Sequence, residues 1–458
     1  MFQSAASPDD VTVYLDGQTG YHKDLPELCE LKMNGVCTVK KVKNFSPAYD
    51  HVELIDLKLD IYGPAEDQLY AAFPALVKNI RRGNTVIKYR DAKNNLKWTL
   101  GRKGLEKFFD LRYEHISPEQ RFDDSCLDDE THMHKNYILA GPLREILDGH
   151  KVEVIKTLKA NGENVQVSWN PEINSWIICS KNVGLAAQNR QQVAMYQADR
   201  FGFAKEMAHV WFDILENLEK AHGKVKVEEL ISELTGNTLI GEYIGSDQHQ
   251  HLVKYSRVTI IFYAVVSNMS MDDCWPCDQS WAFFTKFGLD KCHAESLGQF
   301  TNYTEMTDAL CKVFKDVAKS EIAKDEEGNV LYFIKRAKEG SQKDKVLSLA
   351  KLKTLEYRLF RKMREKLRNA YAQKDGVQSN PDKGGICKKF RREAKELSDE
   401  HELPRPLEYY CKLFEMAFQF IESDMSTNLD LLHKEYVTFS EKLLTFFNKH
   451  NTDKEFAN

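Results

Sequence analysis

The fold is decided by the stretch Leu158-Lys159-Ala160-Asn161-Gly162-Glu163, which places one lysine between an apolar run and a glycine. The preceding residues 152–158 are rich in Val, Ile and Leu, as is typical of a buried strand. Such a strand would fix Lys159 and limit its contact with water, and partial burial with cationic neighbours lowers the pKa of an amine. Gly162 predicts an unhindered turn. The stretch therefore predicts a lysine nucleophile at a strand-to-turn junction.

The same spacing also suits an exposed lysine before a β-turn, so other parts of the chain must separate the two interpretations. Residue types that nucleotidyl transfer requires occur in a consistent order on both sides of Lys159. The ordered set consists of Arg81-Arg82-Gly83, Gly101 to Phe109, Ser180-Lys181-Asn182, Leu239 to Tyr243, Thr259 to Val265, Glu327-Gly328-Asn329-Val330 and Lys351-Leu352-Lys353.

In this set, over about residues 75–355, the chain resembles the ATP-dependent RNA ligases of the covalent nucleotidyltransferase superfamily. It is most similar to the branch that holds the bacteriophage RNA ligase of the first type and the fungal tRNA-splicing ligases. Asn161 and Asn164 stand where DNA ligases and capping enzymes carry Asp and Arg, and Lys-Ala-Asn-Gly is similar to the tRNA ligases. This departure argues against a GTP-using capping guanylyltransferase.

The resemblance implies an ATP-dependent RNA ligase that acts in tRNA splicing or RNA repair. Lys159 would attack the α-phosphorus of ATP, expel pyrophosphate and carry AMP. The AMP would pass to a 5′-phosphate on RNA, and a 3′-hydroxyl would then seal the strand. Lys351 and Lys353, as catalytic cations, and Arg82 in the nucleotide site would stabilise charge on the α-phosphate.

The resemblance also implies a nucleotide and metal site. Asn161, Gly162 and Lys181 belong to the expected ATP-binding set, and Gly162 would let the nucleotide approach the backbone closely. Glu242 would hold the nucleoside sugar. Glu327 would bind a divalent ion, and Mg²⁺ is expected because hard oxygen ligands suit it.

A ring from Phe262 or Tyr263 would stack on the adenine, but alternation along a strand sends these two to opposite faces, so only one can do so. Other interpretations also stay open. Glu327-Gly328-Asn329 suits a hairpin turn, and Lys351 and Lys353 could be ordinary basic residues at a helix start. The alternative function is a ligase-fold RNA-binding protein without catalysis, which would bind RNA without lysine adenylylation.

Composition indicates a soluble globular protein, because 42% of the 458 residues are hydrophobic and 29% are charged. This length predicts two domains. We expect an α+β fold, with a nucleotidyltransferase core of antiparallel sheets and flanking helices at 1–355 and an all-α, RNA-binding domain at 356–458. Strands are predicted near 85–89, 165–169, 176–179, 258–266 and 330–334, and helices at 203–220, 407–423 and 429–448.

Basic residues gather near the C-terminal part although the net charge is −5. Residues 345–396 contain sixteen Lys or Arg and six Asp or Glu. A solvated helix face is one interpretation, and a contact surface for the RNA phosphate backbone is the one we favour. The chain has no P-loop motif, so separate enzymes would have to heal damaged RNA ends.

The ten cysteines predict reduced thiols, because no signal peptide is evident and no run is long enough to span a membrane. A cytoplasmic or nuclear location is expected. Cys274, Cys277 and Cys292 could bind zinc or could be ordinary thiols. His132 and His134 are expected to be polar loop residues.

Overall fold

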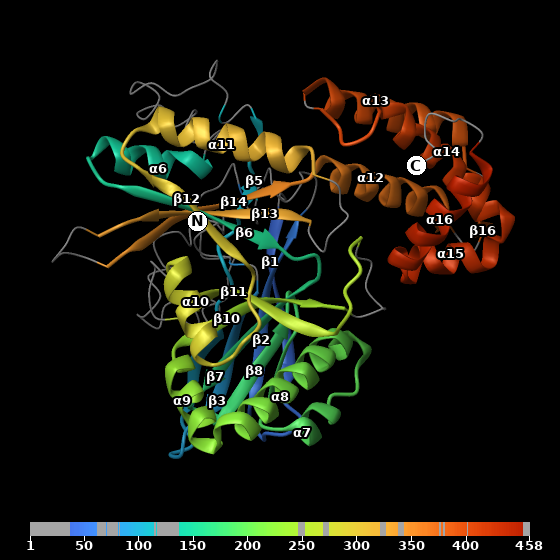
Figure 1. Cartoon of the computed structure of the whole chain (residues 1–458). Coiled ribbons are helices and arrows are strands. Elements are labelled where there is room, and N and C mark those ends of the chain that lie inside the picture. The colour runs from blue at the N-terminus through green and yellow to red at the C-terminus, as the bar shows by residue number, and fades with distance from the viewer. Residues whose placement is uncertain are drawn as a thin grey trace, which may run out of the picture.

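The computed structural model describes residues 37–61, 70, 81, 83–113, 116, 137–245, 252–268, 274–320, 327–337, 343–374, 377–378, 381–400 and 402–451. Sheets of mainly antiparallel strands with flanking helices form the larger part, and a group of helices follows at the C-terminal end (Figure 1). This arrangement confirms the α+β fold class. Arg82, His132 and His134 lie outside the described residues.

The first sheet holds the predicted lysine strand near its centre. Its strands are, in spatial order, β12 (Ala294–Phe300), β6 (Val152–Lys159), β13 (Gly328–Lys335), β14 (Lys345–Lys353) and β5 (Phe109–Asp110). Neighbouring strands are antiparallel except for the short β14–β5 pair, which is parallel. Helices α6 (Tyr137–Leu147) and α11 (Tyr303–Ala318) cover one face of this sheet (Figure 1).

The second sheet is fully antiparallel. Its spatial order is β11 (Thr259–Ser267), β10 (Asn237–Ile244), β7 (Glu163–Asn170), β8 (Ser175–Ser180) and β9 (Gly184–Ala187). Its outer face carries α8 (Gly202–His222), α9 (Lys224–Leu234) and α10 (Cys277–Lys286), with the short α7 (Arg190–Ala194) and a 3₁₀ turn at Asp199–Phe201 beside them. Trp211 of α8 is fully buried against this face. The predicted helix at 203–220 and strands at 165–169 and 176–179 are confirmed.

The inner faces of the two sheets pack on each other. Apolar side chains that alternate with outward-facing ones along each strand fill the space between them. This layer contains Ile155, Val330, Tyr332, Ile240, Ala264 and Val266. The packing sets the lysine strand of one sheet against the strands that carry Glu242 and Tyr263 in the other.

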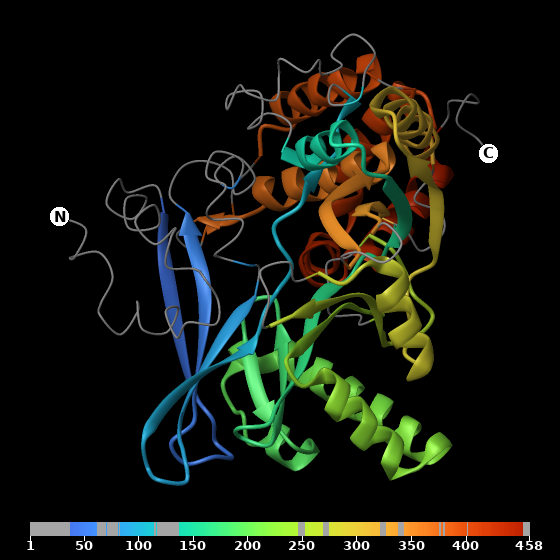
Figure 2. The same cartoon turned by 90° about the vertical axis from the view of Figure 1, so that its left-hand side faces the viewer.

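A third sheet precedes the other two in sequence. It contains β1 (Cys37–Phe45), β2 (Glu53–Ile61), β3 (Asn84–Arg90) and β4 (Leu96–Arg102) in sequential order. Leu54 and Ile87 pack against Ile177 and Cys179 of β8. Figure 2 shows these blue strands standing beside the green strands of the second sheet.

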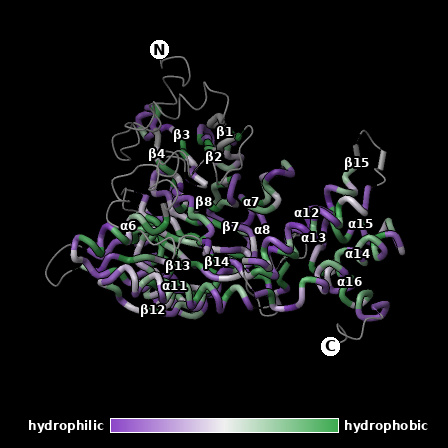
Figure 3. Tube along the Cα trace, turned by 90° about the horizontal axis from the view of Figure 1, so that it is seen from above, coloured by the Kyte–Doolittle hydropathy of each residue, from purple (hydrophilic) through white to green (hydrophobic). Residues whose placement is uncertain are grey.

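The chain changes from strand to helix directly after β14. The C-terminal helices are α12 (Leu355–Ala370), α13 (Lys383–Glu400), α14 (Leu407–Ser423), α15 (Met425–Lys434) and α16 (Tyr436–His450), with a small β15 (Gln373–Lys374) and β16 (Val377–Gln378) hairpin between the first two. Hydrophobic and hydrophilic positions alternate along these helices (Figure 3), as expected for helices with one buried face. One apolar cluster joins them to the first sheet, so a division into domains at residue 355 stays a prediction.

The predicted helix at 429–448 is wrong in one respect. The chain breaks at Glu435, whose φ of −132° and ψ of 65° lie outside the helical region, so two helices form instead of one. The apolar spacing continues through the break, which is why the sequence pattern conceals it. Among the described helices none is both long and apolar enough to cross a bilayer.

Candidate active site

Three neighbouring strands bring Lys159, Glu327 and Lys353 together. Gly328, the first residue of β13, lies opposite Lys159 on β6 and opposite Lys353 on β14. Glu327 therefore lies between the two lysines, with its Oε2 2.9 Å from the Nζ of Lys159 and its Oε1 3.5 Å from the Nζ of Lys353. The structure thus joins the predicted nucleophile, the predicted metal ligand and a predicted catalytic cation.

The carboxylate of Glu327 keeps the lysine protonated. Burial lowers the pKa of Lys159, but the charges of Glu327 and Glu242 outweigh burial and hold that pKa above its usual value. Burial acts to raise the pKa of Glu327, but Lys159 and Lys353 lower it to about 2. The expected lowering of the Lys159 pKa by cationic neighbours is wrong, because its nearest charged groups are carboxylates. The amine must lose this partner before it can act as a neutral nucleophile.

Asn161 connects the lysine turn to three other segments. Its side-chain Nδ2 donates to Glu327 Oε2 and to the Tyr357 hydroxyl, both at 3.3 Å. Its Oδ1 accepts from the consecutive backbone N–H groups of 252–253 at 2.8 and 3.2 Å. Its own backbone N–H donates to the Tyr255 hydroxyl at 2.7 Å. An asparagine suits this position because it donates and accepts at once, which a carboxylate cannot do.

Gly162 is required for a close contact that the sequence did not predict. A Cβ at this position would lie 2.2 Å from the backbone oxygen of Tyr243 and 2.8 Å from Cγ of Glu242. The glycine therefore allows the lysine turn to lie directly on β10, and its backbone is not in the left-handed region. This contact sets Glu242 beside Lys159.

Glu242 faces the lysine from the second sheet. It lies on β10 opposite Asn164 of β7. Burial raises its pKa to about 8, against the opposing effect of Lys159. This carboxyl group therefore keeps its proton to a higher pH than an exposed glutamate does.

The two candidate stacking aromatics on β11 point to opposite faces, as alternation predicts. Phe262 is fully buried among Trp211 and Phe284, so it cannot reach a ligand. Tyr263 faces the other side and contacts the cavity described below. A β-bulge explains this position, because Gly241 pairs with Phe262 and Ile240 pairs with Ala264, leaving Tyr263 as the extra residue. The stacking prediction is therefore left with Tyr263.

A cavity of about 420 Å³ opens beside Lys159. It takes in the predicted Gly162, Lys181, Lys351 and Lys353 together with the residues already described. The Nζ of Lys351 lies 4.8 Å from the ring centre of Phe108, a cation–π distance. Further lining residues are Leu105, Glu106, Glu163, Asn164, Gln166, Ile240, Tyr357, Arg361 and Arg364. Of the predicted site residues that the structure describes, Phe262 alone does not line it.

The sequence did not predict that helix α12 contributes to the cavity wall. Tyr357, Arg361 and Arg364 reach it from the first turns of this helix. The two arginines stand in the basic run assigned to RNA contact, and their spacing of three residues puts them on one helix face. Nothing in the sequence signals that this face meets Lys159 rather than solvent.

Carboxylates within the protein engage much of the basic stretch. Lys362 and Lys366 both pair with Glu393, at 3.0 and 2.9 Å. Arg361 pairs with Glu365 at 2.9 Å, and Arg391 pairs with Glu408 at 2.5 Å. Part of the positive charge of the basic stretch is therefore matched by carboxylates of the protein itself.

The described residues contain no group of three or more His, Cys, Asp or Glu side chains that could hold a metal ion. Cys277 and Cys292 are buried free thiols, and Cys274 is a half-buried one. Burial raises the pKa of Cys292 to about 12. Glu327 still brings two hard oxygen atoms to the wall of a polar cavity. A divalent ion at Glu327 therefore needs further ligands from the substrate, as is usual for Mg²⁺ on nucleotide phosphates.

No protein-family model matches the sequence, and no curated protein matches it either. Among solved structures the chain is similar to an archaeal ATP-dependent RNA ligase, at 11% identity and a TM-score of 0.39, over 82% of this chain and 76% of that one. It is also similar to a putative ATP-dependent DNA ligase from Aquifex aeolicus, at 13% identity and a TM-score of 0.37, over 93% and 80% of the two chains.

An RNA ligase mutant from Naegleria gruberi, solved with ATP and manganese, is a further neighbour. Its identity is 12% and its TM-score 0.30, over 70% of this chain and 98% of that one. These structural neighbours are ATP-dependent RNA and DNA ligases. At such identities and TM-scores, the similarity does not by itself assign a function to this chain.

Proposed function

We propose that this protein is an ATP-dependent RNA ligase that joins a 5′-phosphate to a 3′-hydroxyl through lysyl-AMP and RNA-adenylate intermediates. The observation that carries the proposal is the position of Lys159 at the end of a rigid strand, facing a polar cavity and paired with Glu327. A lysine held in this way can attack a phosphorus atom in a fixed direction. A binding protein would not need a nucleophile so placed.

The charges around the cavity support phosphoryl chemistry. Lys351, Lys353 and Lys181 line it from the two sheets, and Arg361 and Arg364 line it from α12. Such fixed cations stabilise the negative charge that develops on a phosphate oxygen during the attack. Loss of one preorganised donor would raise the barrier by about 3 kcal/mol.

The lysine has to be released from its carboxylate partner during the reaction. Glu327 would hold a divalent ion, and Mg²⁺ is the expected one. With its charge shared with that ion, Glu327 would no longer act on Lys159 as its closest anionic partner. The pKa of the amine would then fall, because burial and a nearby positive charge both disfavour its protonated form. The chemistry that the ion would supply is neutralisation of charge on the phosphates.

The two later steps, transfer of AMP to RNA and sealing of the strand, would take place in the same cavity. The adenylate would pass from Lys159 to the 5′-phosphate of an RNA, and a 3′-hydroxyl would displace AMP as the strand is sealed. The substrates would be tRNA halves or broken RNA in the cytoplasm or nucleus, prepared by separate end-healing enzymes. The phosphate backbone of such strands would lie along the basic helices that follow β14.

The covalent step can be tested directly. Purified protein is incubated with Mg²⁺ and ATP labelled at the α-phosphate, and label that stays on the denatured protein is measured. We expect acid-labile label on the parent and none on Lys159→Ala. Lys156→Ala is the matched control, because Lys156 lies on the same strand and pairs with Glu295 at 2.8 Å, outside the cavity. That variant should label normally.

Label that fails to appear with both ATP and GTP, in folded protein free of bound AMP, would contradict the ligase mechanism. It would favour a ligase-fold RNA-binding protein. Once labelling is seen, matched RNA and DNA strands with 5′-phosphate ends would identify the substrate. Transfer of label to RNA and not to DNA is the expected result.

A further inference from the structure

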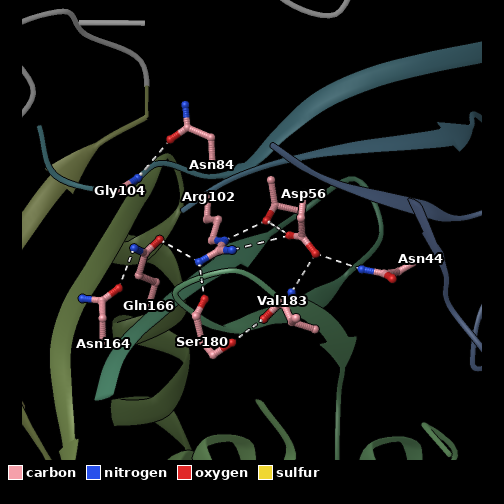
Figure 4. A network of polar contacts seen from close by, with 11 residues as sticks. Asn44, Asp56, Asn84, Arg102, Gly104, Asn164, Gln166, Ser180 and Val183 are labelled. Carbon is pink, nitrogen blue, oxygen red and sulfur yellow. Dashed lines mark hydrogen bonds and ion pairs between the residues drawn. The ribbon is translucent and has the colours of Figure 1, made fainter. Parts of the chain in front are cut away.

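A buried arginine lies at the centre of a polar network between the third and second sheets (Figure 4). The side chains of Arg102 and Asp56 are 0% and 2% exposed, and Arg102 NH2 lies 3.4 Å from Asp56 Oδ1. Asp56 also accepts from the Thr85 hydroxyl at 2.5 Å and from Asn44 Nδ2 at 2.8 Å. This pair is sealed from solvent, and Arg102 donates hydrogen bonds to Thr85, Gln166, Ser180 and Asp56, so the arginine has a fixed orientation.

From Arg102 a chain of hydrogen bonds leads to the cavity. Arg102 NH1 donates to Gln166 Oε1 at 2.9 Å, and Gln166 Nε2 donates to Asn164 Oδ1 at 2.8 Å. Asn164 Nδ2 donates to the Tyr263 hydroxyl oxygen at 2.9 Å. We call Arg102, Gln166, Asn164 and Tyr263 the arginine relay. Its last three members line the cavity.

The arginine determines the direction of every bond in the relay. A guanidinium group has only donors, so Gln166 must turn its oxygen toward Arg102 and its NH₂ toward Asn164. Asn164 must then turn its own oxygen toward Gln166 and its NH₂ toward Tyr263. The amide orientations follow from this network and not from the shapes of the side chains.

The relay leaves the hydrogen of the Tyr263 hydroxyl pointing away from Asn164. Because that oxygen accepts from Asn164, its own O–H must donate in another direction. In the part of the chain that the structure describes, no acceptor is hydrogen-bonded to this O–H, and the residue borders the cavity. Burial raises the pKa of Tyr263 above its usual value, so the hydroxyl keeps its proton at neutral pH.

The backbone near the relay is adapted to it. Gly83 has φ of +106°, and a Cβ there would lie 2.5 Å from Gln166 Nε2 and 2.8 Å from Arg102 NH1. Only glycine leaves room for both side chains in this conformation. The β-bulge on β11 turns Tyr263 toward the cavity, and its backbone oxygen accepts from the Tyr332 hydroxyl of the first sheet at 2.7 Å.

We infer that Tyr263 is a specificity-determining residue whose hydroxyl donates a hydrogen bond to a ring nitrogen of the purine base, and that the arginine relay fixes this donor direction. The tyrosine would then meet the edge of the base, in place of the stacking on its face that the sequence suggested. Ring nitrogens N1, N3 and N7 of adenine are acceptors, so adenine can accept such a bond at any of its edges. The inference rests on the proposed function, because it takes the bound base to be that of ATP. It gives the third sheet a role in nucleotide recognition.

The test measures discrimination and not affinity alone. Binding of ATP and of its 1-deaza, 3-deaza and 7-deaza analogues is measured by calorimetry, in full-length protein carrying Lys159→Met so that no covalent product forms. Each analogue replaces one acceptor nitrogen by C–H. We expect one of the three to bind about 3- to 10-fold more weakly than ATP, the value of one hydrogen bond.

Two variants should remove this discrimination. Tyr263→Phe deletes the donor and leaves the ring. Asn164→Asp reverses the relay at its last bond, because a carboxylate only accepts and so captures the Tyr263 hydrogen. Its added charge weakens ATP and its analogues alike, so the ratio between them is unaffected by that charge.

Glu163→Gln is the matched control, since Glu163 lines the cavity outside the relay, and it should retain the full ratio. If the affinity ratio between ATP and every deaza analogue is the same in the parent and in Tyr263→Phe, the hydroxyl does not contact a ring nitrogen. ATP binding itself is not contradicted by that result. If Asn164→Asp keeps the parent ratio in folded protein, the relay is overturned. If the parent binds no nucleotide, the proposed function fails and this inference fails with it.

Discussion

Two carboxylate–cation clusters in this protein differ in their exposure to solvent. Asp56 and Arg102 are sealed inside the molecule, with 2% and 0% of their side chains exposed. Glu327 is 7% exposed, but its partners Lys159 and Lys353 are 18% and 15% exposed and border the cavity. The sealed cluster uses arginine, which keeps its charge, and the open cluster uses lysine, which can lose a proton. Similar ion pairs therefore serve rigidity in one place and chemistry in the other.

The largest effect should come from opening the sealed cluster. Asp56→Asn would leave the guanidinium of Arg102 buried without a counter-charge, so the free energy of unfolding should fall by about 3–5 kcal/mol. Urea denaturation followed by circular dichroism measures this change. The exposed pair of Arg190 and Asp213, 2.6 Å apart, provides the control, and Asp213→Asn should cost less than about 1 kcal/mol. Equal losses would show that burial does not distinguish the two pairs.

The open cluster should respond in activity more than in stability. Glu327→Gln would remove the carboxylate charge, which pairs with Lys159 and which we expect to hold a cation. Lysine adenylylation should therefore slow by about 10²- to 10³-fold. The loss of stability should be smaller than for Asp56→Asn, because solvent in the cavity can reach both lysines. Single-turnover labelling and thermal unfolding of the same sample compare the two. A variant that labels at the parent rate would remove Glu327 from the mechanism.

A smaller effect on stability is expected at Asn161, which holds the turn after Lys159 by hydrogen bonds. Asn161→Asp removes the donor to Glu327 and puts a second carboxylate 3.3 Å from it, so stability should fall by about 1–3 kcal/mol. Asn302→Asp makes the same chemical change at the N-cap of α11, where Asp is equally favourable, and should be neutral. Thermal unfolding of both variants makes the comparison. A neutral Asn161→Asp would mean that the Asn161 amide does not hold the turn.

The carboxyl of Glu242 should give the open cluster its own pH dependence. Its pKa rises from an ordinary 4.5 to about 8 on folding, so the folded state binds this proton more tightly than the unfolded state. Its contribution therefore favours folding below pH 4.5 and is lost as the pH rises through about 8. Relative to Glu242→Gln, the parent should lose about 1 kcal/mol or more of unfolding free energy between pH 5 and pH 9. A constant difference would contradict the raised pKa.

The smallest effect on stability and activity is expected for an ion pair that is exposed to solvent and lies outside the cavity. Lys254 and Glu441 lie 3.0 Å apart but are 69% and 53% exposed. Lys254→Ala should change the free energy of unfolding by less than about 0.5 kcal/mol and leave adenylylation unchanged. Chemical denaturation and the labelling assay test both statements. A clear loss of labelling would show that adenylylation requires the ion pair between the loop at 252–258 and α16.

The sequence predicted the open cluster well, because its members stand at the ends of strands and in motifs. Lys159 and Glu327 are 168 residues apart, and the order of short motifs around them was enough to assign them to one site. The shift of the Lys159 pKa was nevertheless predicted in the wrong direction, as a decrease instead of an increase. Local sequence shows which residues precede the lysine and not which distant carboxylate meets it.

The sealed cluster could not be predicted. Asp56 belongs to no motif, and Arg102 and Gln166 become partners only when two sheets pack. The choice between Phe262 and Tyr263 depended on a bulge, and a bulge in β11 leaves no mark in an apolar run. The contribution of α12 likewise depends on the angle at which a helix leaves a strand.

Helix α12 starts two residues after Lys353, and its apolar side chains belong to the same cluster as Leu331 and Leu352 of the first sheet. A gene shortened at residue 353 would therefore encode a sheet that has lost part of the apolar cover on one face and a cavity that lacks Tyr357. Exchange of the C-terminal helices between related chains would meet the same obstacle. We therefore expect the helices and the sheet to change together during evolution, as one inherited unit.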